Sequence, residues 1–239
     1  KGLRYEEVFN DLTGDERNAF TDRFWKLLQQ FESDERVELE LVRIEEEVRE
    51  GPSFVGIGLP TLDLITEVRP GDASNGRQET LHVRLKVGGF QAHVVQTLRA
   101  MGVPAHLIAE VGGTAGERVK ALFPEGSATF VDGREVRKTI MLVRGEGRRE
   151  LRLLDVGESG GLTREEVREW WNRIPSEDGQ APRGVLLGGR FPGSPEGQAI
   201  AASTFSGLIR TSDLPVYLSV NPRWTAQTVY TILGTEAAP

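Results

Sequence analysis

Cysteine is absent from the 239 residues of this chain, which excludes disulfide bonds, thiolate metal sites and cysteine nucleophiles together. Histidine is scarce, and His82, His93 and His106 lack the spacing of metal ligands, so no metal site is expected. No apolar run approaches the roughly 18 to 20 residues needed to cross a bilayer. The first residues are polar and acidic, unlike a secretory signal peptide. These absences favour a cytoplasmic protein with no membrane partner.

The net charge of -7 is confined to the first quarter of the chain. Residues 1–54 carry 15 acidic and 8 basic side chains, whereas the remainder carries 21 of each. Nucleic-acid binding depends on a basic surface that neutralises phosphates. A neutral body with an acidic appendage therefore argues against nucleic acid as a partner.

Residues 1–52 are expected to form an acidic helical extension. Thr13 and Glu16 have the spacing of a capping box, and apolar residues follow at helical intervals. A second stripe, within residues 35–50, places apolar residues between charges at Val37, Leu41, Ile44 and Val48. Such stripes must be buried against something. The favoured interpretation is a helical hairpin that packs on the body, and the alternative is a docking or dimerisation element.

From residue 53 onward, short strands alternate with helices. Buried strands are expected at 53–58, 105–111, 183–189 and 214–220, and helices at 90–101, 114–123, 163–174 and from about 195. Two other segments, 80–87 and 137–154, alternate apolar and charged residues, as strands exposed on one face do. The pattern predicts a mostly parallel sheet with helices on both faces, and a second group of strands standing off it.

Gly88 and Gly89 lie between the strand at 80–87 and the helix that follows. Paired glycines at such a junction allow either a tight turn or the close approach of a ligand to the backbone. In a doubly wound sheet, ligands bind beyond the carboxyl ends of strands, where Asp63 and Asn221 also fall. The sequence here has neither the P-loop motif nor the G-x-G-x-x-G of a dinucleotide fold.

The chain contains four features in this order: a strand ending in LDLI, a strand that stands off the main sheet, GGxxxH at the start of a helix, and G-x(9)-G at the end of that helix. Gly102 and Gly112 are the last pair, separated by residues 103–111. This series resembles the first signature of the PfkB, or ribokinase-like, family of sugar and nucleoside kinases. The segments 137–167, 184–193 and 215–224 are similar to later segments of the family, so the likeness covers about residues 53–233.

The resemblance implies an α/β fold, a ribokinase-like three-layer αβα sandwich with a small β lid. Its partial domain would span 53–239 after the extension, with lid strands at about 66–88 and 128–155. The C-terminal part of that fold is expected to be missing. The family's second signature, a Gly-Ala-Gly-Asp segment with the catalytic aspartate, has no counterpart in this sequence.

The resemblance also implies a substrate site. Asp63 stands at the family's sugar-hydroxyl-binding aspartate, and Gly88, Gly89 and His93 are expected around the same cleft under the lid. His93 replaces the asparagine of the signature, which points to a changed substrate or to relaxed constraint. Two cations near the lid, Lys138 and Arg148, are candidates for binding a substrate phosphate.

The function implied is ATP-dependent phosphorylation of a sugar or sugar-phosphate hydroxyl, with ATP and Mg²⁺ as cofactors of the family. This chain would supply the substrate-binding and lid portion and no catalytic residue of its own. Two alternatives stay open: a catalytically inactive relative that acts as an interaction or regulatory module, and a nucleoside kinase fragment. A homodimer through the lid or the N-terminal helices is a further expectation.

Overall fold

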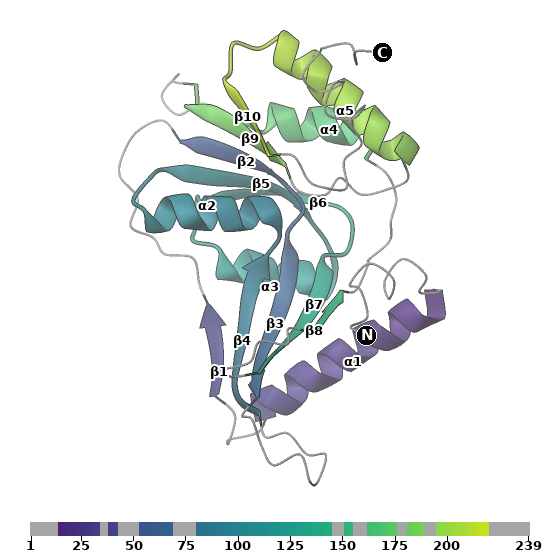
Figure 1. The fold of residues 1–239 in the computed structure, drawn as a ribbon. Coiled ribbons are helices and arrows are strands. Elements are labelled where there is room, and N and C mark those ends of the chain that lie inside the picture. The colour runs from purple at the N-terminus through teal and green to yellow at the C-terminus, as the bar shows by residue number, and fades with distance from the viewer. Residues whose placement is uncertain are drawn as a thin grey trace.

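The computed structural model describes residues 14–33, 38–42, 53–68, 80–144, 151–154, 162–175, 181–188 and 195–219. These residues form five helices and two five-stranded sheets (Figure 1). The helices are α1 (Gly14–Ser33), α2 (Phe90–Ala100), α3 (Gly113–Leu122), α4 (Arg164–Asn172) and α5 (Pro195–Arg210). The strands are β1 (Glu38–Val42), β2 (Phe54–Gly58), β3 (Thr61–Val68), β4 (Thr80–Gly88), β5 (Ala105–Val111), β6 (Ala128–Asp132), β7 (Arg137–Arg144), β8 (Leu151–Leu154), β9 (Gly184–Gly188) and β10 (Val216–Ser219).

The main sheet has the strand order β10–β9–β2–β5–β6 and is parallel throughout. The chain adds β5 and β6 on one side of β2 and later adds β9 and β10 on the other side. Right-handed crossovers then place α2 and α3 on one face and α4 and α5 on the opposite face. The two apolar clusters agree, since Leu107 packs with α2 and α3 while its neighbour Ile108 packs with α4 and α5. The predicted α/β architecture is confirmed.

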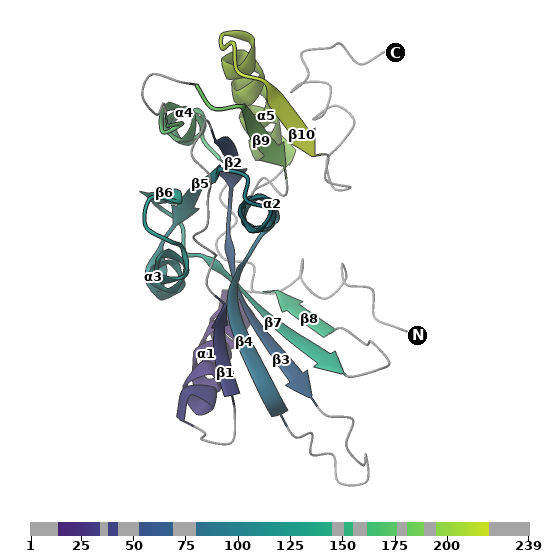
Figure 2. The same cartoon turned by 90° about the vertical axis from the view of Figure 1, so that its left-hand side faces the viewer.

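The second sheet, here called the lid sheet, has the order β1–β4–β3–β7–β8. Only Leu59 and Pro60 separate β2 in the main sheet from β3 in the lid sheet. One face of the lid sheet is covered by α1, whose Phe24 and Leu28 are 0% and 1% exposed (Figure 2). These side chains join the apolar cluster that also contains residues of β3, β4 and α3. The first helix thus packs on the body, as favoured from its apolar stripe.

The prediction that the second half of the N-terminal hairpin is helical is wrong in the part that the structure describes. Residues Glu38–Val42 form β1, which pairs in parallel with β4 from Glu38 opposite His82 to Val42 opposite Lys86. The sequence VELELV carries a two-residue alternation inside the longer helical stripe. At the edge of β4, the backbone groups of this segment find hydrogen-bond partners as a strand. The strand pattern therefore prevails over the helical spacing.

The lid boundaries also differ from those expected. Ala128–Asp132 pairs with β5 and is the edge of the main sheet, so the later lid strands begin with β7 at Arg137. In the earlier lid segment, strand β3 begins at Thr61 rather than near residue 66. The expected hairpin of residues 137–154 is confirmed by the antiparallel pairing of β7 and β8.

Two helix ends match their sequence signals. The Thr163 hydroxyl accepts a hydrogen bond from the Glu166 amide at 3.2 Å, and the Glu166 carboxylate accepts one from the Thr163 amide at 2.6 Å. This is the capping box expected before α4. Gly102, with φ 72°, follows α2 in the left-handed conformation that ends many helices. Of the helices described, none is both long enough and apolar enough to cross a membrane.

Candidate functional site

The β2–β3 turn meets the end of β4 where the two sheets join. Asp63 on β3 is 6% exposed, and its Oδ1 accepts a hydrogen bond from Thr61 Oγ1 at 2.7 Å. Thr61 pairs with Gly88 in the antiparallel register of β3 and β4. A Cβ atom on Gly88 would overlap Asp63 Oδ2, so only glycine leaves room for this carboxylate. The structure therefore brings Asp63 and Gly88 into direct proximity.

Glycine is required at position 89 for a different reason. Its φ of 94° lies in the region that side chains disfavour, and a Cβ atom would stand 2.6 Å from the Leu59 carbonyl oxygen. Both glycines are thus required by the chain's own packing, one against a carboxylate and the other against the β2–β3 turn. The close backbone approach anticipated from the glycine pair occurs, and its partner is the protein itself.

The same glycine is the N-cap of α2, where no side chain caps the helix. The first amides of α2 carry the partial positive charge of a helix N-terminus. His93 lies one turn into the helix, half-buried, and its backbone amide donates to the Gly89 carbonyl at 3.0 Å. Gln96, three residues later on the same flank, donates from Nε2 to the Val87 carbonyl at 3.1 Å. The flank of α2 that carries His93 therefore faces the end of β4.

Lys138 does not share a face with Asp63. Residues paired across neighbouring strands point to the same side of a sheet. Asp63 pairs with Thr139, whereas Lys138 pairs with Leu62, whose side chain belongs to the apolar cluster beneath the sheet. Lys138 is 1% exposed, and its Nζ lies 2.6 Å from Glu135 Oε1 in an ion pair. Its position places this ammonium on the opposite side of the lid sheet from the Asp63 carboxylate.

Arg137 is the basic residue of β7 that shares the face of Asp63, because it pairs with Thr61. Arg137 was not among the residues predicted from the sequence, although two-residue alternation along β7 distinguishes it from Lys138. The other cation expected near the lid, Arg148, lies outside the described residues, as does Asn221.

Gln91 fills the space between the carboxyl ends of β2 and β9. A Cβ atom on Gly58, the last residue of β2, would lie 2.8 Å from Gln91 Cγ. One on Gly188, the last residue of β9, would lie 3.2 Å from Gln91 Nε2. The side chain is 2% exposed, and neither Oε1 nor Nε2 has a hydrogen-bond partner among the described residues. These two strands flank the point where the strand order reverses, which is where open α/β sheets bind ligands.

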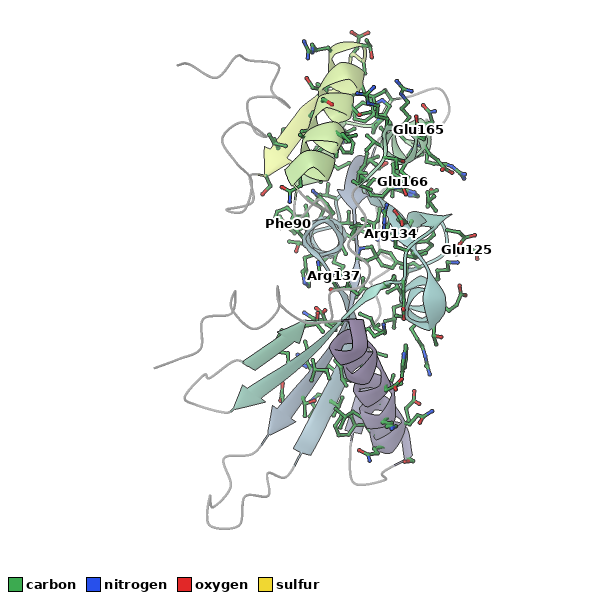
Figure 3. The ribbon with its side chains drawn as sticks, turned by 90° about the vertical axis from the view of Figure 1, so that its right-hand side faces the viewer. Phe90, Glu125, Arg134, Arg137, Glu165 and Glu166 are labelled. Atoms are coloured by element: carbon green, nitrogen blue, oxygen red, sulfur yellow. The ribbon has the colours of Figure 1, made fainter. Side chains whose placement is uncertain are left out.

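A buried ionic cluster joins β5 to α4. The carboxylate of Glu110, 3% exposed, accepts hydrogen bonds from the Arg134 amide at 2.6 Å and from Arg134 Nη1 at 2.8 Å. Arg134 Nη2 donates to Glu166 Oε1 at 2.8 Å (Figure 3). Burial raises the pKa of Glu110 against the opposing effect of Arg134. Burial also acts to raise the pKa of Glu166, but hydrogen bonds from Thr163 and Arg134 lower it overall. Each of these charged groups has a partner, so the cluster acts as a structural clamp.

Metal-binding geometry is lacking from the described part of the chain. No three histidine, aspartate or glutamate side chains gather there as a metal site would require. The described candidates that do meet are Asp63, Gly88, Gly89 and the start of α2. They form one corner at the junction of the sheets, with Gln91 behind it.

No protein-family model matches the chain, and no curated protein sequence matches it. Solved structures do match its fold. Phosphofructokinase-2 of Escherichia coli in complex with potassium has a TM-score of 0.55 and 18% identity, over 77% of this chain and 57% of that chain. A possible 1-phosphofructokinase of Thermotoga maritima has a TM-score of 0.55 and 18% identity, over 78% of this chain and 58% of that one. The fold is ribokinase-like.

Phosphofructokinase-2 of Escherichia coli in complex with fructose-6-phosphate shares this ribokinase-like fold, with a TM-score of 0.52 and 16% identity over 79% of this chain and 66% of that chain. The chain spans just under three fifths of the length of the first two kinases. It is therefore a partial ribokinase-like fold. At these identities the likeness concerns the fold, and the chemistry of the site depends on the residues described above.

Proposed function

We propose that the complete protein transfers a phosphoryl group from ATP to a hydroxyl of a sugar or sugar phosphate, and that this chain supplies the substrate-binding part and the lid. The observation that supports this most is the buried Asp63 carboxylate beside Gly88 and the start of α2. A carboxylate accepts hydrogen bonds only, so it suits the hydroxyl groups of a sugar. The ribokinase-like fold of the chain, shared with phosphofructokinases, agrees with this assignment.

Each residue of this corner has a proposed role. Asp63 accepts hydrogen bonds from substrate hydroxyls through Oδ2, because Oδ1 is already bonded to Thr61. The backbone at Gly88 and Gly89 and the first amides of α2 approach the substrate closely. The His93 imidazole hydrogen-bonds a further hydroxyl in place of the asparagine found in similar kinases. Arg137, rather than Lys138, is proposed to face the phosphate of a sugar-phosphate substrate.

The described residues do not fit ATP or Mg²⁺. They contain no carboxylate cluster for the metal, and the Gly-Ala-Gly-Asp segment that would provide an anion hole and a base is not in the sequence. We therefore assign no step of phosphoryl transfer to this chain. Transfer requires groups that position and neutralise the phosphoryl group, and in this proposal they lie elsewhere in the complete protein.

Two alternatives remain as proposals. A catalytically inactive protein that acts as an interaction or regulatory module is favoured by His93 in place of asparagine. A nucleoside kinase shares the fold and the aspartate and differs in its substrate. Cytoplasmic location and the absence of nucleic-acid partners are proposed from composition, since cysteine is lacking and the body is neutral.

Thermal unfolding of the chain with sugars, fructose 6-phosphate and nucleosides tests the site. A ligand at 100 times its dissociation constant stabilises the folded state by about 2.7 kcal/mol. We expect a sugar or sugar phosphate to raise the melting temperature and Asp63→Asn to abolish the effect. Asp132→Asn, which changes an aspartate of β6 that is 92% exposed, is the matched control. Stabilisation by nucleosides alone would favour the nucleoside kinase, and stabilisation that survives in Asp63→Asn would refute this site.

The complete protein with ATP then separates enzyme from binding module. Phosphorylation of the ligand that stabilises the chain supports the kinase. Binding without transfer, at saturating ATP and Mg²⁺, supports the inactive alternative.

Homodimerisation through the lid competes with α1 in this proposal, because Phe24 and Leu28 already occupy one face of the lid sheet. We therefore propose that the lid sheet pairs with a second copy through its opposite face or its edge. Mass in solution is the measurement that decides it.

A further inference from the structure

A hollow of about 330 Å³ lies between α4 and α5, on helices that Figure 1 shows side by side. It shares no residue with the Asp63 corner. Among the described residues, its lining consists of Arg164, Arg168, Ser203, Thr204, Gly207 and Leu208. The charged side chains among these six residues are both arginines.

The charged side chains on the two flanks of α4 differ in their ion-pair partners. On the flank away from α5, Glu166 is paired with Arg134, and Glu169 Oε1 lies 3.1 Å from Arg173 Nη2. Arg164 and Arg168 stand four residues apart on the flank toward α5, the side on which Trp171 contacts Phe205 edge to face.

Neither Arg164 nor Arg168 has an ion pair within the described residues. Like charges at this spacing repel each other in an isolated helix, and a bound anion would remove that repulsion. A bound anion between the two guanidinium groups would therefore stabilise this arrangement.

The α5 side of the hollow supplies hydroxyl groups and open space. Ser203 Oγ and Thr204 Oγ1 both donate to the Ile200 carbonyl, at 3.0 and 2.8 Å. Their oxygen atoms remain available as acceptors for hydroxyl groups of a ligand. A Cβ atom on Gly207 would have no neighbour within 4 Å, so the floor of the hollow at this point is open.

We propose that this hollow binds the phosphate group of a small phosphate ester, with Arg164 and Arg168 on the phosphate and Ser203 and Thr204 on hydroxyl groups of its organic part. Arginine matches phosphate geometry because its planar fork donates two parallel hydrogen bonds. The volume is at the lower end of small-molecule sites and exceeds what a bare phosphate ion fills. The site is separate from the proposed substrate corner and does not depend on the proposed kinase activity.

Isothermal titration of the full chain tests the proposal with three probes: glycerol 3-phosphate, inorganic phosphate and glycerol. The titrations use Asp63→Asn as the starting protein, so that binding at the substrate corner does not contribute. We expect glycerol 3-phosphate to bind most tightly, inorganic phosphate at least several-fold more weakly, and glycerol not at all. Affinity for the ester should fall as salt rises from about 50 to 500 mM, because the contact is ionic and partly exposed.

Three variants locate the binding. The double variant Arg164→Gln, Arg168→Gln removes both charges and should weaken binding of the ester at least tenfold. Gly207→Leu places a side chain in the hollow without a clash at Cβ and should weaken it by a similar factor with both arginines intact. Arg173→Gln removes an equal charge from the other flank of α4 and should leave the affinity unchanged. Thermal unfolding checks that every variant is folded.

Equal affinity in the double variant and the Asp63→Asn protein would overturn the proposal. So would binding of inorganic phosphate as tight as that of the ester, since the organic part would then make no contact. Equal losses in Arg173→Gln and the double variant would show a general charge effect, which also overturns it. No heat from any probe would mean that the hollow is not a phosphate-ester site.

Discussion

Replacing Gln91 with methionine should stabilise the protein. The amide of Gln91 is buried between α2 and the ends of β2 and β9, and both of its polar atoms lack a partner among the described residues. A buried donor or acceptor without a hydrogen bond costs about 1–3 kcal/mol. Methionine keeps the length and flexibility of the side chain and removes both polar atoms. We expect a gain of about 1–3 kcal/mol in the free energy of unfolding, which allows for imperfect packing of the new sulfur and methyl groups.

Urea denaturation measures this change, and Gln96→Met is the matched control. Gln96 lies on the same helix, and its Nε2 donates to the Val87 carbonyl at 3.1 Å. Removing that hydrogen bond should cost about 0.5–1.5 kcal/mol, so the two substitutions should have opposite signs. For a protein of this size, 1 kcal/mol corresponds to about 2–4 °C in melting temperature. If Gln91→Met destabilises the chain as much as Gln96→Met does, the amide is satisfied in solution and the reasoning fails.

Three further outcomes follow from the described contacts. Gly88→Ala should destabilise by at least about 2 kcal/mol in denaturation experiments, because its Cβ overlaps the Asp63 carboxylate, whereas Gly207→Ala should gain up to about 1 kcal/mol from helix propensity; similar effects at both positions would contradict the packing described. The lowered pKa of Glu166 means that its contribution to stability is complete above the 4.5 of an unperturbed glutamate and is lost as pH falls below it. Glu166→Gln should therefore flatten the fall of melting temperature with acidification more than Glu165→Gln does, and identical pH profiles would argue against it. Phe24→Ala should cost about 3–5 kcal/mol if α1 is part of the core, while a change below about 1 kcal/mol would mean that the helix is only loosely attached.

Much of the fold could be predicted because local signals agreed with one another. The alternation of buried strands with helices, the Thr163–Glu166 capping box and Gly102 after α2 each correspond to elements in the structure. Glu38–Val42 was assigned to a helix because two periodicities overlap there. The tertiary partner, the edge of β4, decided between them, and no local pattern reports that edge.

The candidate site was predictable in part. Asp63, Gly88 and Gly89 were recognised from the order of motifs, and the structure brings them together. The basic residue of β7 that lies on the same face as Asp63 depends on strand register, since a shift by one residue moves every side chain to the other face of the sheet. Register places Arg137 beside Thr61 and Lys138 beside Leu62. The tight fit of Gln91 among glycines could not be inferred, because those glycines are distant in sequence and meet only when β2 and β9 pair.

The direct passage from β2 to β3 has a consequence for how the molecule opens. β2 (Phe54–Gly58) lies between β5 and β9, and β3 (Thr61–Val68) lies between β4 and β7. One short segment of the chain therefore supplies the central strand of each sheet. Its amides are shielded by neighbours on either side along nearly its whole length. Amide hydrogen exchange should therefore be slowest here, and residues of β2 and β3 should exchange with a single opening free energy. The main sheet and the lid sheet would then unfold as one cooperative unit, even though they are separate sheets.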